Sequence, residues 1–144
     1  MDPAKNSQNA SAPTLLVVED HRATRIMLID WLGAVFPTHQ CLGAGSGEEA
    51  VALARTHEPA LVVMDYALPG LNGIEATRQI KQITPRVRVI LLSMYEAEVY
   101  QTEATAAGAS AYLFKRTMYT DFIPTVQALL ALSADTPTAR GSSE

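Results

Sequence analysis

The sequence has only one cysteine and a shortage of basic residues. Cys41 has no second thiol to pair with, which excludes an internal disulfide and a multi-cysteine metal cluster. Apolar Leu42 follows it, which favours a buried thiol over a reactive one. The 11 Lys and Arg residues are outnumbered by 15 Asp and Glu residues, so the net charge is −4. Because an acidic chain has no general attraction for nucleic acid, we expect no nucleic-acid partner for this chain alone.

Long apolar runs are also absent. The chain has no run of about 18 apolar residues, the length at which a segment is read as a transmembrane helix. Residues 1–12 lack the apolar core of a secretory signal peptide. We therefore expect a cytoplasmic protein with no membrane partner.

The rest of the composition is typical of one globular domain. The chain has 144 residues, of which 48% are hydrophobic and 18% are charged, enough for a sizeable core. Residues 1–13 and 134–144 are rich in small and polar residues, so we expect a flexible tail at each end. The second of these also fits the start of a linker. The globular block is expected at 14–133.

Short apolar runs and helical patterns alternate through that block. The expected strands are 15–18, 40–44, 61–64, 87–92 and 111–114, and the expected helices are 24–35, 48–57, 74–83, 97–107 and 121–132. This order indicates an α/β fold, in which a doubly wound parallel sheet has helices on both faces. Ligands bind such sheets outside the carboxyl ends of the strands, so the residues after each strand are the candidate site.

Those residues carry the groups that phosphoryl transfer needs. They are Glu19, Asp20, Asp65, Ser93 and Lys115. Carboxylates that share a crevice repel one another, and a divalent cation removes that cost. Oxygen ligands suit Mg²⁺, and Mn²⁺ would fit the same set. The cation and the lysine would neutralise a phosphoryl group, the hydroxyl would bond it, and one carboxylate would be the nucleophile.

Each residue taken alone also has a plainer interpretation. Asp20 could cap the first helix, and a lysine after a strand is usually solvated. His21 could be a metal ligand or a phosphoryl relay, but a loop residue at the rim is the favoured interpretation. The Gly-rich segment 43–47 lacks the residues of a phosphate-binding loop, and Glu48 and Glu49 favour an ordinary helix start. The joint occurrence of five such residues at successive strand ends favours the functional interpretation.

The sequence resembles a CheY-like receiver domain of a two-component response regulator, of the NarL/FixJ type, over about residues 14–133. The matching motifs are Glu19-Asp20-His21, the Asp65-x-x-x-Pro69-x-x-x-Gly73 spacing, Leu92-Ser93-Met94-Tyr95, and the segment from Ala109 to Lys115. The resemblance implies a five-stranded parallel sheet of order 2-1-3-4-5.

The resemblance also implies a role for each site residue. Asp65 would accept a phosphoryl group from a histidine kinase or a phosphotransfer protein. Mg²⁺ would be bound by Glu19, Asp20, Asp65 and the backbone carbonyl of Ala67. Ser93 and Lys115 would contact the phosphoryl oxygens, and Tyr112 would be an aromatic residue that rotates with Ser93. The output would be a downstream protein or self-association, through the face of helix 97–107, strand 111–114 and helix 121–132.

Two positions depart from the usual receiver pattern. Receivers often have proline after the lysine, with a cis peptide bond, whereas Arg116 follows Lys115 here. Ser93 replaces the commoner threonine and keeps its hydroxyl.

The chain would be a regulated substrate rather than an enzyme with turnover, with slow self-phosphorylation and slow acyl-phosphate hydrolysis.

Two other functions stay open as alternatives. A Mg²⁺-dependent phosphatase of the haloacid-dehalogenase type also uses an Asp after a strand, but it needs a second Asp where this chain has Ala67. A DNA-binding regulator needs a helix-turn-helix, which the chain does not contain after Ser133. That function survives only if these residues are part of a longer protein.

Overall fold

A computed structural model describes residues 12–143 of the chain, with side chains as far as residue 132. The strands are β1 (Thr14–Val18), β2 (Gln40–Ala44), β3 (Leu61–Asp65), β4 (Arg88–Ser93) and β5 (Ala111–Phe114). The helices are α2 (Arg22–Val35), α3 (Gly47–His57), α4 (Gly73–Ile83), α5 (Glu98–Ala107), the short η1 (Lys115–Thr117) and α6 (Met118–Ser143). Strands and helices alternate along the chain, as the sequence predicts.

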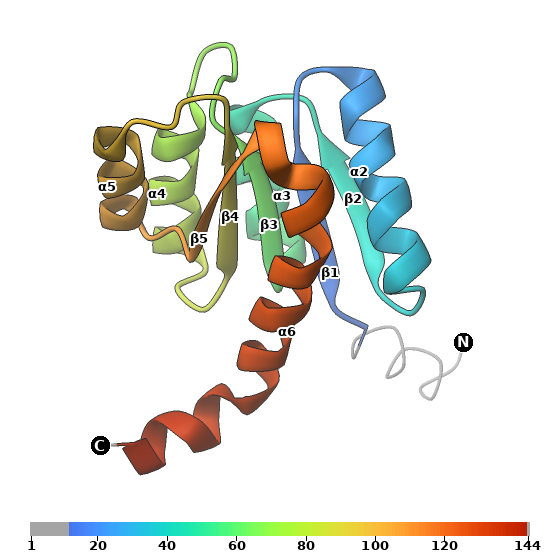
Figure 1. The fold of residues 1–144 in the computed structure, drawn as a ribbon. Coiled ribbons are helices and arrows are strands. Elements are labelled where there is room, and N and C mark those ends of the chain that lie inside the picture. Colours follow the sequence, from blue (N-terminus) through green and yellow to red (C-terminus); the bar gives the residue numbers. More distant parts are fainter. Residues whose placement is uncertain (1–11, 144) are drawn as a thin grey trace.

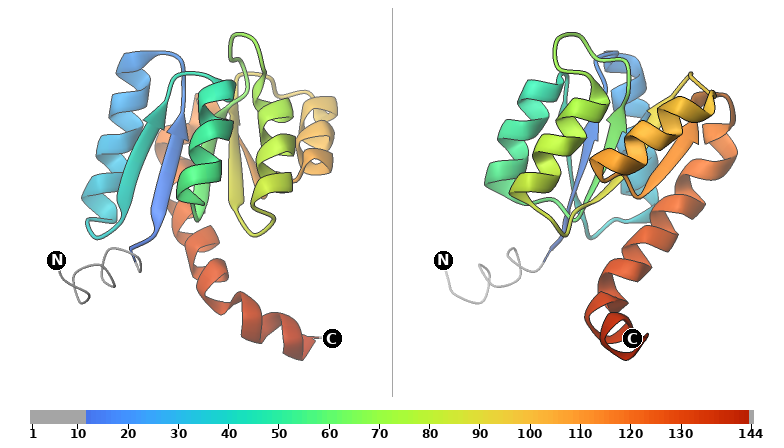
Figure 2. Two further views of the ribbon diagram at one scale, coloured as in Figure 1. Left: turned by 180° about the vertical axis from the view of Figure 1, so that it is seen from behind. Right: turned by 90° about the vertical axis from the view of Figure 1, so that its left-hand side faces the viewer.

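The strands form one parallel sheet in the order β2-β1-β3-β4-β5, which confirms the predicted topology. Helices α2 and α6 cover one face of the sheet, and α3, α4 and α5 cover the other (Figures 1 and 2). The chain order reverses between β1 and β3, and the carboxyl ends of these two central strands lie side by side. This is the edge where an open α/β sheet binds ligands.

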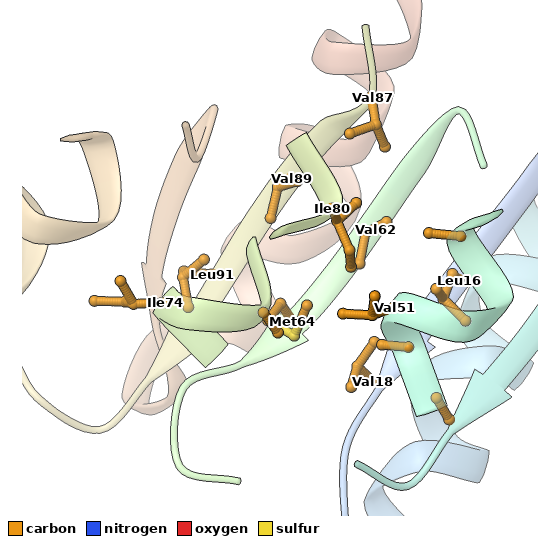
Figure 3. Close-up of a cluster of buried hydrophobic side chains, with 14 of the residues drawn as sticks. Leu16, Val18, Val51, Val62, Met64, Ile74, Ile80, Val87, Val89 and Leu91 are labelled. Atoms are coloured by element: carbon orange, nitrogen blue, oxygen red, sulfur yellow. The ribbon is translucent and has the colours of Figure 1, made fainter. Parts of the chain in front are cut away.

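Alternation of side chains along the buried strands divides the core into two layers. Leu16, Val18, Val62 and Met64 point to the layer under α3 and α4, where they pack with residues such as Ile80 (Figure 3). The intervening residues Leu15, Val17, Leu61 and Val63 point to the other layer, under α2 and α6. Both layers need apolar residues, which is why these strands are continuous apolar runs rather than alternating ones.

Local hydrogen bonds fix the helix starts near the site edge. Ser46 caps α3 by accepting a bond from the Glu49 amide, so the Gly-rich segment is a helix start, as expected. Asn72 caps α4 by accepting a bond from the Glu75 amide. A Cβ at Gly73 would lie 2.3 Å from the carbonyl oxygen of Asp65, so only glycine fits there. The loop after β3 is thereby held close to the strand end.

The last helix is longer than the sequence predicts. We expected a helix at 121–132 and a polar tail at 134–144, whereas the α6 backbone stays helical to Ser143 and extends away from the sheet (Figure 1). Residues 134–143 carry no apolar periodicity, so the hydrophobic pattern gave no reason to expect a helix there. Residues 1–11 of the predicted N-terminal tail lie outside the described residues. No helix of the described chain is both long enough and apolar enough to cross a bilayer.

Candidate functional site

The site lies at the carboxyl ends of β1, β3 and β4. Glu19, Asp65 and Ser93 are buried there, with relative exposures of 0%, 3% and 1%. Glu19 follows the last residue of β1, while Asp65 and Ser93 are the last residues of β3 and β4. Asp65 is in register with Leu92 of the neighbouring strand, which brings Ser93 to the same edge. The parallel sheet therefore gathers residues that are far apart in sequence.

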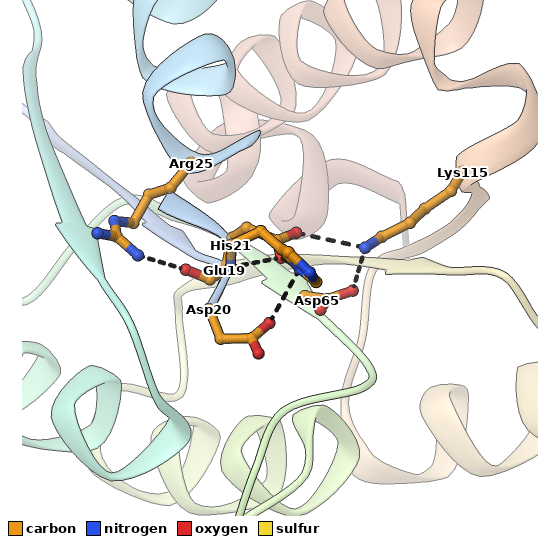
Figure 4. Close-up of polar contacts among 6 residues, drawn as sticks. All are labelled: Glu19, Asp20, His21, Arg25, Asp65 and Lys115. Atoms are coloured by element: carbon orange, nitrogen blue, oxygen red, sulfur yellow. Dashed lines mark hydrogen bonds and ion pairs between the residues drawn. The ribbon is translucent and has the colours of Figure 1, made fainter. Parts of the chain in front are cut away.

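Lys115 reaches this edge from the first position of η1, directly after β5 (Figure 4). Its Nζ lies 2.7 Å from Asp65 Oδ1 and 3.3 Å from Glu19 Oε1. Because β4 separates β5 from β3, the long lysine side chain is what spans the distance. The contact places a cation against two buried carboxylates.

The pKa values of Asp65 and Lys115 depend on their burial and on the charges around them. Burial raises the pKa of Asp65, and the charges of Glu19 and Asp20 add to that effect, while the hydrogen bond and charge of Lys115 oppose it. Burial by itself would lower the pKa of Lys115, but the hydrogen bond to Asp65 and the charges of Asp65 and Glu19 outweigh it and raise the pKa. Lys115 therefore stays an ammonium, and Asp65 is a more basic carboxylate than a solvated aspartate.

Asp20 and His21 form the outer rim of the site. His21 Nδ1 lies 3.3 Å from Glu19 Oε2 and 3.6 Å from Asp20 Oδ1. The N-cap of α2 is His21 rather than Asp20, and no side chain caps the helix, so the capping interpretation of Asp20 is wrong. Figure 4 shows Arg25 on the opposite side from Lys115, where its Nη1 donates to the Glu19 carbonyl at 2.7 Å.

Ser93 and Tyr112 are both bonded to the backbone of Tyr95. The Ser93 Oγ accepts a bond from the Tyr95 amide at 2.9 Å, and the Tyr112 hydroxyl donates to the Tyr95 carbonyl at 2.6 Å. Burial raises the pKa of Tyr112, and a side-chain hydrogen bond with Ser93 opposes that effect. The two residues that the family resemblance pairs are thus joined through the loop 94–97.

Arg116 ties the same loop to η1. Its Nε and Nη2 donate to the two carboxylate oxygens of Glu96 at 2.7 and 3.0 Å. The described chain has no cis peptide bond, so the backbone passes from Lys115 to Arg116 in the trans form. Sequence reasoning missed this ion pair, because nothing in the local pattern of Glu96 or Arg116 indicates a partner 20 residues away.

The donor set at this edge suits a hard divalent cation. Glu19, Asp20 and Asp65 offer carboxylate oxygens, and Ala67, whose carbonyl the resemblance implicates, lies in the loop directly after β3. Glu19, Asp20 and His21 bring one ligand atom each to within 4.8 Å of one another. Carboxylate and carbonyl oxygens are the ligands that Mg²⁺ prefers. The sequence analysis favoured His21 as a loop residue at the rim, and its side chain is 79% exposed there.

Comparison with known proteins gives consistent matches over this fold. The family model of the response regulator receiver domain matches residues 15–127. The transcriptional activator protein ExaE of Pseudomonas putida is 35% identical over 117 residues, which cover 81% of this chain and 55% of that protein. The transcriptional regulatory protein DegU of Brevibacillus brevis is 35% identical over 108 residues, covering 74% of this chain and 45% of that protein. The chain thus spans about half the length of the curated relatives it matches.

Solved structures agree with the sequence matches. A LuxR-family two-component response regulator from Aurantimonas sp. SI85-9A1 superposes with a TM-score of 0.77 at 32% identity, covering 84% of this chain and 86% of that one. The response regulator domain of Thermotoga maritima CheB gives a TM-score of 0.72 at 27% identity, covering 83% of this chain and 97% of that one.

Proposed function

The chain belongs to the receiver-domain family of two-component response regulators, and on that premise we propose that Asp65 accepts a phosphoryl group from a histidine kinase or a phosphotransfer protein. The observation that carries the proposal is the buried Asp65 carboxylate at the end of β3, with Oδ1 2.7 Å from Lys115 Nζ. A buried aspartate with a raised pKa and an adjacent ammonium is poised as a nucleophile toward a charged group.

In the proposed step, an Asp65 carboxylate oxygen attacks the phosphorus of the donor's phosphohistidine. The bond between phosphorus and the imidazole nitrogen breaks, and that nitrogen keeps the electron pair and takes up a proton. Lys115 stays protonated and neutralises charge on the phosphoryl oxygens. The product is an acyl phosphate on Asp65 and a free histidine on the donor.

Receiver domains generally bind Mg²⁺ in an acidic pocket, and the residues here fit that ion. Glu19, Asp20, Asp65 and the Ala67 carbonyl would hold it, and Mn²⁺ would fit the same oxygens. When bound, the ion supplies further neutralisation of the phosphoryl charge. It also removes the repulsion among the carboxylates that burial at this edge imposes.

Receivers are phosphoacceptors and generally not turnover enzymes, so the reaction of this chain is stoichiometric. Self-phosphorylation from a small donor and hydrolysis of the acyl phosphate are the slow reactions we propose in addition. The family match and Ala67, two residues after Asp65, both argue against the dehalogenase-type phosphatase.

The output of the chain is proposed to be a protein contact. Phosphorylation at Asp65 would change the face made by α5, β5 and α6, which a downstream protein or a second copy would then bind. The matched relatives are named as transcriptional regulators, and this chain covers about half of them, so a DNA-binding segment in a longer protein is the alternative output. The net charge of −4 gives this chain no general electrostatic attraction for DNA.

The test is phosphorylation of the purified chain with acetyl phosphate and Mg²⁺, followed by intact-mass measurement. Wild type should gain one phosphoryl group, and Asp65→Asn should gain none, because the amide keeps the shape but lacks the anionic oxygen. Asp30→Asn is the matched control, since Asp30 is an exposed aspartate on α2. Equal labelling of Asp65→Asn and wild type would overturn the assignment.

A further inference from the structure

We infer that Glu19, Asp20 and His21, the 19–21 segment, bind a transition-metal ion such as Zn²⁺ through His21 Nδ1 and the two carboxylates. The inference rests on the proposed function, because it uses two carboxylates of the proposed Mg²⁺ site. It goes further by giving His21 a role and by changing which ion the site prefers.

The spacing of the ligand atoms carries the inference. Nδ1 of His21 lies 3.3 Å from Glu19 Oε2 and 3.6 Å from Asp20 Oδ1. Zinc ligands lie about 2.0–2.2 Å from the ion, and tetrahedral geometry then places neighbouring ligand atoms about 3.3–3.6 Å apart. The two separations from His21 Nδ1 match this arrangement, and one ligand atom from each of the three residues lies within 4.8 Å of the others. A fourth position is left for water.

The backbone holds the segment in place between two regular elements. β1 ends at Val18 and α2 begins at Arg22, so the ligands are consecutive residues in a three-residue loop. The Glu19 amide donates to the Ala44 carbonyl at 3.0 Å, and the Glu19 carbonyl accepts from Arg25 at 2.7 Å. The His21 amide donates to Glu19 Oε2 at 3.1 Å, which fixes the glutamate rotamer. Little rearrangement is therefore needed for binding.

The two oxygens of Glu19 face different partners. Oε1 faces Lys115 at 3.3 Å, and Oε2 faces His21 at 3.3 Å. An ion bound through Oε2 leaves the contact between Lys115 and Asp65 intact, so the zinc site does not require Asp65. The His21 side chain is 79% exposed, so its Nε2–H can stay hydrated while Nδ1 binds the ion.

The types of ligand atom decide whether the 19–21 segment prefers Zn²⁺ or Mg²⁺. Imidazole suits Zn²⁺, Cu²⁺ and Ni²⁺, whereas Mg²⁺ takes oxygen ligands and keeps much of its water. His21 should therefore add affinity for zinc and almost none for magnesium. Because both ions need Glu19 and Asp20, zinc should compete with magnesium for the site.

The test is calorimetric titration of the chain with Zn²⁺ alone and with Mg²⁺ alone. We expect His21→Ala to weaken zinc binding by about tenfold or more, because losing even an outer-shell partner of a ligand costs at least about tenfold and His21 would be a direct ligand. Its magnesium affinity should change less than about twofold, because Mg²⁺ uses the oxygens alone. His57→Ala, at an exposed histidine on α3, is the matched control and should bind both ions as wild type does. Asp65→Asn should weaken magnesium binding and leave zinc binding unchanged.

A nitrogen NMR spectrum of the imidazoles gives a second measurement. Zinc should move the Nδ1 resonance of His21 and leave that of His57 in place. Equal zinc affinity in wild type and His21→Ala, or a zinc shift at Nε2 instead, would overturn the inference while leaving phosphorylation of Asp65 untouched. Zinc binding that is lost in His21→Ala, in a chain that acetyl phosphate does not label, would support the inference and overturn the proposed function.

Discussion

At the residue scale, the site places a carboxylate where its charge is costly. Asp65 is almost fully buried, and burial raises its pKa in spite of the Lys115 ammonium at 2.7 Å. A sheet optimised for stability alone would have a neutral residue at this position. The position is consistent with a group kept for its chemistry, because reactive carboxylates are found in such environments.

Asp65→Asn should therefore make the folded protein more stable at neutral pH. Burial raises the pKa of the Asp65 carboxyl in the folded state above its pKa in the unfolded state. Such a carboxyl contributes most to folding stability at a pH below its unfolded-state pKa. That contribution is lost as the pH rises through its folded-state pKa. At pH 7 the wild type has lost this contribution, whereas the amide has no charge to bury. The measurement is Tm at pH 7 and below pH 3.8, the ordinary value of the carboxyl.

The variant should melt at a higher temperature at pH 7, and the difference should shrink at the acidic pH, where both side chains are neutral. A lower Tm for Asp65→Asn at pH 7 would show that the pairing with Lys115 outweighs the cost of burial.

Asp20 differs from Asp65 because its side chain is one-third exposed at the rim of the site, where solvent reaches its charge. Asp20→Ala should weaken Mg²⁺ binding by about tenfold or more, which corresponds to at least about 1.4 kcal/mol. It should leave the fold intact, because no helix cap depends on this side chain. Titration calorimetry with Asp30→Ala as the control measures the effect. Equal Mg²⁺ affinity in Asp20→Ala and wild type would remove Asp20 from the site.

At the scale of single elements, the loop 94–97 has more anchors than its sequence suggests. Tyr112 holds the Tyr95 carbonyl, and Arg116 holds Glu96 with two hydrogen bonds. Tyr66, Tyr95 and Tyr100 also pack ring against ring around the loop. The loop that leads from Ser93 into α5 is thus fastened both to β5 and to η1.

Glu96→Gln should loosen that loop with little loss of overall stability. The ion pair is exposed, with side chains 40% and 65% accessible, and exposed pairs contribute little to unfolding free energy. Amide exchange at 95–97 should be faster than in wild type, and high salt should produce a similar increase in the wild type. Glu75→Gln, which removes the exposed pair with Arg78 on α4, is the matched control. Unchanged exchange in Glu96→Gln would show that the tyrosines alone hold the loop.

The same scale shows what the sequence can and cannot predict. The runs at Leu15 and Leu61 predicted buried strands, because a strand between two helical layers needs apolar residues on both faces. Strand ends then located Glu19, Asp65 and Lys115. The bonds of Arg116 to Glu96 and of Tyr112 to Tyr95 depend on tertiary proximity and side-chain rotamers, which no local pattern records. The helical backbone of 134–143 was missed for the related reason that it has no apolar stripe.

At the scale of the whole molecule, the site and the proposed output face are joined through neighbouring strands. Asp65 is on β3, Ser93 on β4 and Tyr112 on β5, and these strands are adjacent in that order. One chain of contacts from Ser93 to Tyr112 passes through both backbone groups of Tyr95. A phosphoryl group on Asp65 would accept a hydrogen bond from the Ser93 O–H, while Ser93 Oγ accepts one from the Tyr95 amide. If Ser93 moved toward the phosphoryl group, the Tyr95 backbone bonded to it would be drawn along. The loop and Tyr112 would then have to adopt a second arrangement.

Ser93→Ala should therefore still be phosphorylated on Asp65 but should transmit much less to Tyr112. A full reversal of a two-state equilibrium from 1:99 to 99:1 needs about 5.5 kcal/mol of differential interaction. One hydrogen bond to a charged group supplies about 1.5–3 kcal/mol, so Lys115 and the cation must supply the rest or the shift is partial. The measurement is the change in NMR shifts around Tyr112 on adding beryllofluoride, a phosphoryl mimic, to wild type and variant. Ser110→Ala is the control, because Ser110 bonds the Val89 amide away from the site edge. The change in NMR shifts around Tyr112 should be reduced in Ser93→Ala and as large as in wild type in Ser110→Ala. Equal changes in all three proteins would mean that Ser93 is not needed for the structural change at β5.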